Sequence, residues 1–132
     1  MINKITALLI ALLAIACGDE KLVKAENAQD AGRQFIRASL DGDYRKAKFF
    51  LLKDDDNLRL FEKYHNDYQH LPGNEKRQYR DANIRPLSIT PVNDSLTKYT
   101  YQHSSNLKDT FTLSVVRING EWLVDLKSII ER

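Results

Sequence analysis

The dipeptide Asn119-Gly120 constrains the fold more than any other feature of this sequence. It separates two apolar runs, "TFTLSVVRI" and "EWLVDLK", and Asn-Gly in that position is a strong hairpin signal because both residues accept positive φ in a type I′ turn. A two-residue loop predicts these pairs: Ile118 with Glu121, Arg117 with Trp122, Val115 with Val124 and Leu113 with Leu126. One face of the hairpin is then almost wholly apolar, with Phe111, Leu113, Val115, Trp122, Val124 and Leu126. Because a one-residue slip would scatter this set over both faces, the sequence predicts an antiparallel sheet with one buried face.

Two further strands are expected before this hairpin. The segment "LTKYTYQH" alternates in polarity, whereas "IRPLSITPV" is interrupted by Pro86 and Pro91. Proline cannot donate to a strand ladder, so the second segment predicts an edge or bulged strand.

The first half of the chain predicts helices. Apolar residues at helical spacing, from Ala28 to Ala38, predict a helix over about 25–41. Gly42 is expected to end it, and Asp43 to cap a second helix, "YRKAKFFLL". A third helix begins near "DDDN", ends at Pro72-Gly73 and carries an apolar stripe: Leu58, Phe61, Tyr64, Tyr68 and Leu71. The segment "NEKRQYRD" is expected to add one or two polar helical turns. Helices that precede an antiparallel meander predict an α+β fold with the helices on one side of the sheet.

The N-terminus predicts an export signal. Ile5–Ala16 is an uncharged apolar run of 12 residues, shorter than the roughly 20 that span a bilayer and within the range of about 7–15 found in secretory signals. Ala14-Ile15-Ala16-Cys17 resembles the lipobox of bacterial lipoproteins, with Ala14 where leucine is commoner. The resemblance implies a diacylglycerol on the Cys17 thiol, cleavage before it, and stable membrane anchoring through several acyl chains, palmitate among them. Ordinary secretion with an idle Cys17 is the alternative.

This interpretation divides the chain into a signal peptide (1–16), an acylated cysteine with a tether (17–24) and a domain (25–132). The expected location is the bacterial cell envelope, at the outer membrane, with the periplasmic or the surface side left open. Gly18-Asp19-Glu20 resembles the acidic stretch of surface-exported lipoproteins of the Bacteroidota and equally fits a generic polar linker.

The charge and the cysteine content argue against several kinds of partner and site. The 20 basic and 18 acidic residues give a net charge of +2 without a long basic run, so no nucleic-acid partner is expected. A single cysteine excludes an intramolecular disulfide and a four-thiolate zinc site.

The domain resembles the nuclear transport factor 2-like fold, in a branch of small bacterial lipoproteins of unknown function. The segments that carry the resemblance are "AGRQFIRASLDGDYRKAKFFL" and "FTLSVVRINGEWLVDL", within about residues 25–130. Residues 54–81 form an extended middle that these two segments do not cover. The resemblance implies a curved sheet that wraps a long helix into a cone able to enclose a pocket. Since isomerases, dehydratases and non-enzymatic binders share that fold, it selects no function.

Ketosteroid isomerases of this fold use an aspartate base with a tyrosine in an apolar pocket. Tyr99, Tyr101 and His103 share one face of a strand and Asp125 lies on the last strand, so these four are the candidate catalytic residues. The alternative is cross-strand packing of the tyrosines, with His103 exposed at the strand end and Asp125 facing water. The candidate binding residues are Tyr99, Tyr101, Arg117 and Trp122.

No metal site or cofactor is expected. His65 and His70 are five residues apart, about 140° around a helix, so they cannot share an ion unless the helix ends early near Leu71, and a solvated helix face is expected. Asp54-Asp55-Asp56 lacks the calcium-loop pattern and better fits a helix N-terminus. The expected function is therefore a lipid-anchored module that binds an unknown protein or small molecule without catalysis. The alternatives are an isomerase or lyase that uses the cone pocket and, for assembly, a homodimer through the sheet.

Overall fold

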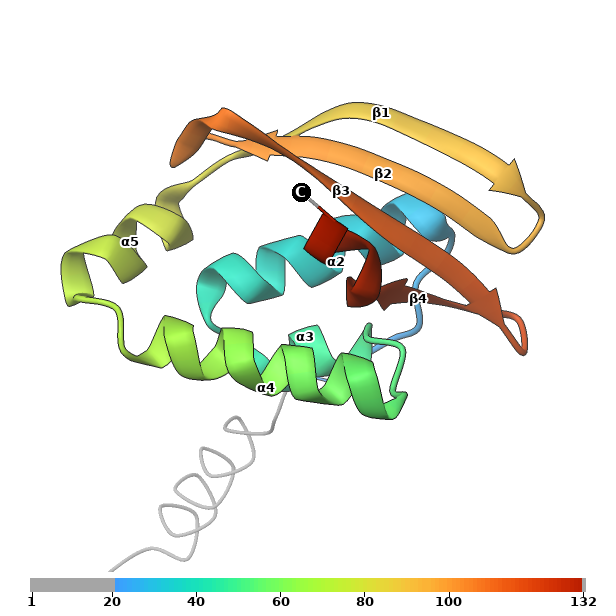
Figure 1. The fold of residues 1–132 in the computed structure, drawn as a ribbon, viewed down its shortest axis with the longest axis horizontal. Coiled ribbons are helices and arrows are strands. Elements are labelled where there is room, and N and C mark those ends of the chain that lie inside the picture. The colour runs from blue at the N-terminus through green and yellow to red at the C-terminus, as the bar shows by residue number, and fades with distance from the viewer. Residues whose placement is uncertain (1–20, 132) are drawn as a thin grey trace, which may run out of the picture.

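The chain folds as α+β, with helices first and a curved four-stranded antiparallel sheet after them, as expected (Figure 1). The computed structural model describes residues 21–131, so Cys17 and the predicted signal peptide lie outside the described residues. The helices are α2 (Ala28–Asp41), α3 (Tyr44–Phe49), α4 (Asp55–Gln69) and α5 (Gly73–Asp81). The strands are β1 (Ile84–Asn93), β2 (Leu96–His103), β3 (Asn106–Ile118) and β4 (Glu121–Asp125), followed by the 3-10 helix η2 (Leu126–Glu131).

The corner between α2 and α3 is built from the residues that the sequence predicts. Gly42 ends α2 at φ 72°, in the left-handed region that favours glycine. The Asp43 amide donates to the Ala38 carbonyl at 2.9 Å, and the Asp43 carboxylate accepts from the Lys46 amide at 3.1 Å. At the other end α2 begins at Ala28 because Asn27 is extended and its side chain accepts from the Asp30 amide.

Helix α3 is shorter than the predicted "YRKAKFFLL" because the chain turns to pair with β4. The Val124 amide donates to the Phe50 carbonyl at 2.7 Å, and the Leu52 amide donates to the Val124 carbonyl at 2.9 Å. These bonds form a parallel bridge between Leu51 and Val124. The short segment thereby covers the edge of β4 that β3 leaves open.

The predicted hairpin register is confirmed over the whole ladder of β3 and β4. Asn119 and Gly120 have φ of 51° and 76°, and the pairs run from Ile118 with Glu121 to Ser114 with Asp125. The predicted pair of Leu113 and Leu126 lies beyond the last pair, because Leu126 begins η2. Both leucines are nevertheless buried.

The sheet has the order β1-β2-β3-β4, and its two faces differ in chemistry. Its concave face wraps α2 (Figure 1) and buries alternate residues of β2, among them Tyr99, Tyr101 and His103. The convex face is polar: Lys98 donates to the Ser114 hydroxyl at 2.7 Å, and Thr100 and Thr112 hydroxyls lie 3.0 Å apart. Edge strand β1 has register shifts after Pro86 and Pro91, as its prolines predict.

Helix α4 faces the core with part of the predicted stripe, because Leu58 and Tyr68 are half-buried. Phe61 is buried, but Tyr64 is 39% exposed and the fully buried residue of the helix is Asn57. The helix ends at Gln69, before Leu71. Asn57 is buried because α4 packs with its N-terminal turn against the end of β4, where its side chain finds polar partners.

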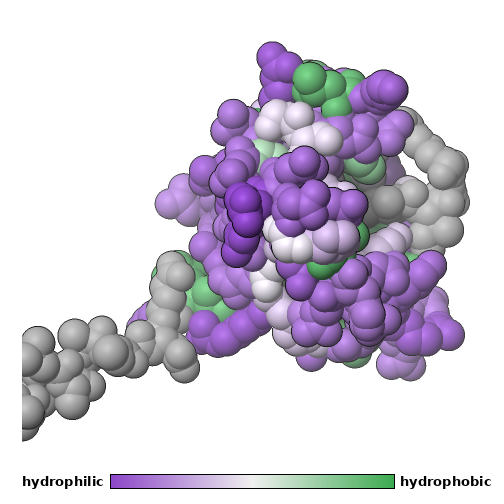
Figure 2. Space-filling view, turned by 90° about the vertical axis from the view of Figure 1, so that its left-hand side faces the viewer, coloured by the Kyte–Doolittle hydropathy of each residue, from purple (hydrophilic) through white to green (hydrophobic). Residues whose placement is uncertain are grey.

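Helix α5 buries no residue of its own and is held mainly by a side chain from α2. The Arg37 guanidinium donates to the Ala82 carbonyl at 2.5 Å and to the Tyr79 carbonyl at 3.1 Å. Figure 2 views the side of the molecule on which α5 lies and shows a mostly hydrophilic surface with small separate hydrophobic areas. Tyr79 of this helix packs inward against His103.

Candidate functional site

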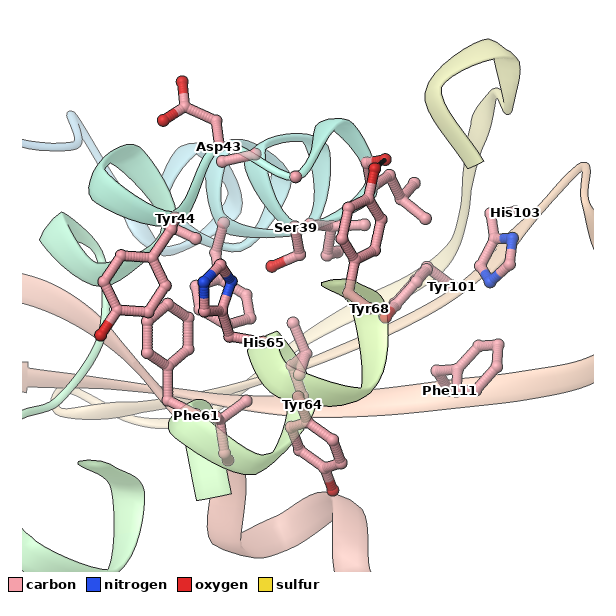
Figure 3. A pocket seen from close by; sticks show the side chains of 18 residues that line it. Ser39, Asp43, Tyr44, Phe61, Tyr64, His65, Tyr68, Tyr101, His103 and Phe111 are labelled. Carbon is pink, nitrogen blue, oxygen red and sulfur yellow. Dashed lines mark hydrogen bonds between the residues drawn. The ribbon is translucent and has the colours of Figure 1, made fainter. Parts of the chain in front are cut away.

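A cavity of about 290 Å³ lies between the concave face of the sheet and helices α2, α3 and α4. Its volume is just below the range of about 300–1,000 Å³ that is usual for ligand pockets. The lining is mainly apolar and aromatic, and it includes Phe35, Phe61, Phe111, Leu113 and Leu126. A few polar groups enter the cavity from α2, α4 and β2, and Figure 3 shows them: Ser39, His65, Tyr68, Tyr101 and His103.

Tyr101 presents an available phenol to this cavity. Its ring stacks on its cross-strand neighbour Phe111 with centroids 5.5 Å apart, and the side chain is 9% exposed. Burial raises the pKa of the Tyr101 phenol, so the group is protonated at neutral pH. The hydroxyl has no hydrogen-bond partner within residues 21–131, and its proton is therefore not used by another described residue.

His103 lines the same cavity and is buried, which corrects the expectation that it is exposed at the strand end. Its ring stacks on Phe111, with centroids 5.4 Å apart and 11° between the planes, and the Tyr79 ring packs edge-on at 6.0 Å. The Ser105 hydroxyl hydrogen-bonds to Nδ1. Burial lowers the pKa of the imidazole, so His103 is neutral at neutral pH.

His65 is also partly buried, which corrects the expectation of a solvated helix face. Its ring centroid lies 4.2 Å from that of Tyr44, whose hydroxyl bonds to Glu62. This hydrogen bond with Glu62 raises the pKa of the Tyr44 phenol. His70 is exposed, and its Nδ1 bonds to the Asn66 carbonyl at 2.7 Å. Over the described range no three His, Cys, Asp or Glu side chains gather as a metal-binding group.

Two of the four candidate catalytic residues lie outside the cavity lining. Tyr99 packs against α2, where a Cβ on Gly32 would lie 3.1 Å from its ring, and its buried hydroxyl has no partner in the described part of the chain. Asp125 does not simply face water: its carboxylate accepts from Asn57 Nδ2 at 3.2 Å and from the Lys127 amide at 3.0 Å. The isomerase interpretation therefore lacks its carboxylate in the cavity.

The carboxylate that does line the cavity, on Asp43, is used as the cap of α3. Figure 3 shows it pointing away from the other labelled side chains. Its Oδ1 accepts from the Lys46 amide. The cavity thus combines aromatic walls and hydrogen-bonding groups without a carboxylate aimed at the phenol of Tyr101.

The two other predicted binding residues lie at the turn end of the β3–β4 hairpin. The Arg117 guanidinium carbon is 5.7 Å from the centre of the Trp122 ring, a cation–π contact. Arg117 is exposed and Trp122 is half-buried. Neither lines the cavity, so the structure separates them from Tyr101.

A polar cluster that the sequence did not indicate joins α4 to β4. The Asn57 side chain accepts from the Leu126 amide at 2.7 Å as well as donating to Asp125. Asp54 caps α4 by accepting from the Asn57 amide, and it pairs with Lys127. The Lys127 hydrogen bond is the main cause that lowers the pKa of Asp54. The aspartates thus mark the helix N-terminus, as predicted, and this cluster places Leu126 in the cavity wall.

Comparison with known proteins leaves the fold and site as the basis for any inference. No family model matches the sequence, and no curated protein resembles it closely enough to be matched. None of the helices in the described residues is both long and apolar enough to span a membrane.

Proposed function

We propose that this chain is a lipid-anchored protein of the bacterial cell envelope whose domain binds a small, largely apolar molecule without catalysis. The observation that carries the binding proposal is the aromatic cavity under the sheet, with the phenol of Tyr101, which has no partner among the described residues, in its wall. Ligand pockets are typically apolar with a small number of placed polar groups. The Tyr101 donor favours a ligand that carries one acceptor, such as a carbonyl oxygen.

The proposed fold is the nuclear transport factor 2-like cone. Three features support it: a helical hairpin at the start, a meander of four strands, and a sheet that curves around α2 (Figure 1). The bridge between Leu51 and Val124 adds a short strand beside β4. The cavity lies where such a cone is hollow, between the sheet and the helices.

A neutral fluorophore, N-phenyl-1-naphthylamine, tests the binding proposal. We expect saturable enhancement of its emission by the chain that begins at residue 17. Ser39 is exposed and its hydroxyl is directed toward the cavity (Figure 3), so Ser39→Trp should fill the opening and weaken binding by about tenfold or more, a change of about 1.4 kcal/mol. Ser88→Trp, an exposed position on β1, is the matched control and should bind as the parent does. Equal affinity of the parent and Ser39→Trp would contradict the proposal.

The anchor is tested separately on the full-length chain expressed in a bacterium. We expect intact-mass analysis of the membrane-extracted protein to show a chain that starts at Cys17 and carries added acyl mass. Cys17→Ser should remain unprocessed and should incorporate no labelled palmitate. A wild-type protein without added mass at Cys17 would reject lipidation while leaving the cavity proposal untouched.

An isomerase or lyase is the second candidate, and one observation favours it: the phenol of Tyr101 and the imidazole of His103 line one cavity. A phenol can stabilise an enolate oxygen, and a neutral imidazole can move a proton. Small cyclic β,γ-unsaturated ketones test this function through the ultraviolet absorbance of the conjugated product. Turnover that Tyr101→Phe abolishes would support it, and absence of turnover with all of them would count against it.

A further inference from the structure

A second surface of the molecule has a distinct composition, and it lies along α3. This α3 groove has a volume of about 600 Å³ and is lined by Lys21, Leu22, Tyr44, Arg45, Lys48, Phe49 and Lys53. Four of its seven residues are basic, three are apolar or aromatic, and none is acidic. Since the whole chain carries a net charge of only +2, the groove is a local concentration of positive charge.

The sequence around α3 explains this concentration. Residues 44–53, "YRKAKFFLLK", contain four basic and no acidic residues. The flanking carboxylates of Asp43 and Asp54 are occupied as helix caps, the latter paired with Lys127. The acidic residues nearest in sequence are therefore committed elsewhere.

The lysines of the α3 groove keep their charge available. Lys48 Nζ lies 5.4 Å from the centre of the Tyr44 ring, and Lys53 Nζ donates to the Leu51 carbonyl at 3.3 Å. Within residues 21–131, neither these two lysines nor Lys21 pairs with a carboxylate. Phe49 is half-buried at the groove wall.

We propose that the α3 groove is a docking surface for the anionic headgroups of a lipid bilayer. Clustered lysine and arginine bind such a surface, each strengthening binding by about fivefold, and aromatic rings beside them sit at the level of the headgroups. The position fits as well, because the described chain begins at Lys21, which itself lines the groove. Cys17 is four residues earlier, a span of at most about 14 Å.

The orientation of the domain rests on the proposed anchor, whereas headgroup binding by the groove does not. A lipid on Cys17 would bring the groove to the bilayer, and the groove would then hold the domain with α3 against the headgroups. The cavity of the proposed function would keep a fixed position relative to the membrane.

The test uses the chain from residue 17 with Cys17→Ser, which carries no lipid. All buried core residues in the described part of the chain lie between Ala28 and Leu126, so this chain keeps that core, and circular dichroism verifies that it is folded. Cosedimentation with vesicles of phosphatidylglycerol and phosphatidylcholine should show binding that weakens as salt rises, and none with phosphatidylcholine alone. Lys21→Gln, Lys48→Gln and Lys53→Gln together should lower the partition coefficient by about 100-fold.

The matched control removes the same charge from exposed positions outside the groove: Arg77→Gln, Arg85→Gln and Lys108→Gln. It should change the partition coefficient by less than about threefold. Equal losses in both triple variants, or binding without preference for the anionic lipid, would overturn the proposal. So would tighter binding to a duplex oligonucleotide at equal phosphate concentration. None of these results depends on whether Cys17 is acylated or the cavity binds a ligand.

Discussion

Removal of the Asn57 side chain is expected to destabilise the domain more than any other change of a polar helix residue in α4. Asn57 is 0% exposed. Its amide side chain accepts from the Leu126 amide at 2.7 Å and donates to Asp125 Oδ1 at 3.2 Å. In Asn57→Ala the buried Leu126 amide has no acceptor, which costs about 1–3 kcal/mol.

The hydrogen bond from Asn57 to Asp125 contributes less to the free energy of unfolding than the charge of Asp125 suggests. Asp125 retains the Lys127 amide at 3.0 Å and the Lys127 ammonium at 3.6 Å, and its side chain is 20% exposed. Water and Lys127 therefore compensate for part of the loss. The total expected decrease in the free energy of unfolding is about 3 kcal/mol, which corresponds to a fall in Tm of about 13 °C for a domain of this size.

Urea and thermal unfolding, followed by circular dichroism at pH 7, measure this change. Asn66→Ala is the matched control, because Asn66 is exposed on the same helix, and its effect should stay within about 0.5 kcal/mol. Asn57→Asp keeps an acceptor for the Leu126 amide but places a second carboxylate beside Asp125, so it should also lower the free energy of unfolding, through repulsion between like charges. If Asn57→Ala were no less stable than Asn66→Ala, the argument that this cluster holds α4 on β4 would be refuted.

Three further predictions concern two residues that line the cavity, His103 and Gly42, and the buried Tyr99 beside α2. Burial lowers the pKa of His103 in the folded state, so the unfolded chain binds the proton more readily. The free energy of unfolding of the wild type should therefore fall as the pH drops below about 6.5, and this fall should be larger than that of His103→Gln. Equal dependence on pH in urea unfolding of the two proteins would contradict this. Tyr99→Phe should leave stability unchanged or raise it by up to about 1 kcal/mol, since the buried hydroxyl has no partner in the described residues; a lower Tm would show that this hydroxyl is paired. Gly42→Ala should lower the free energy of unfolding by about 2 kcal/mol, because φ is 72° and the added Cβ would lie 2.5 Å from the Tyr68 ring. A Tm equal to that of the wild type would show that alanine is not strained at this position.

Local signals predicted the elements of this fold well. Asn119-Gly120 set the hairpin register, Gly42 and Asp43 set the corner between α2 and α3, and the prolines of β1 marked an edge strand. Each of these signals acts through the backbone preferences of a few adjacent residues. Such preferences are present in the sequence before any tertiary contact forms.

The site was predicted less well because its groups meet across long sequence separations. Asn57 and Asp125 are 68 residues apart, and nothing in the residues near Asn57 indicates that it is buried. His103 lies at a strand end, and only the packing of Phe111 and Tyr79 removes it from water. Of the candidate catalytic residues, Tyr101 and His103 line the cavity, whereas Asp125 belongs to the cluster with Asn57.

The sequence by itself determined the order of helices and strands, the register of the last hairpin and an α+β class, because turn chemistry and apolar periodicity are local properties of the chain. It also carries the lipobox-like segment at Cys17, which lies outside the described residues. Tertiary structure alone decided which polar groups enter the cavity and which form the hydrogen bonds that hold the helices on the sheet. The physical reason is that the cost of burying a polar group depends on the partners that distant elements bring to it, and these partners exist only once α4, α5 and the sheet have packed together.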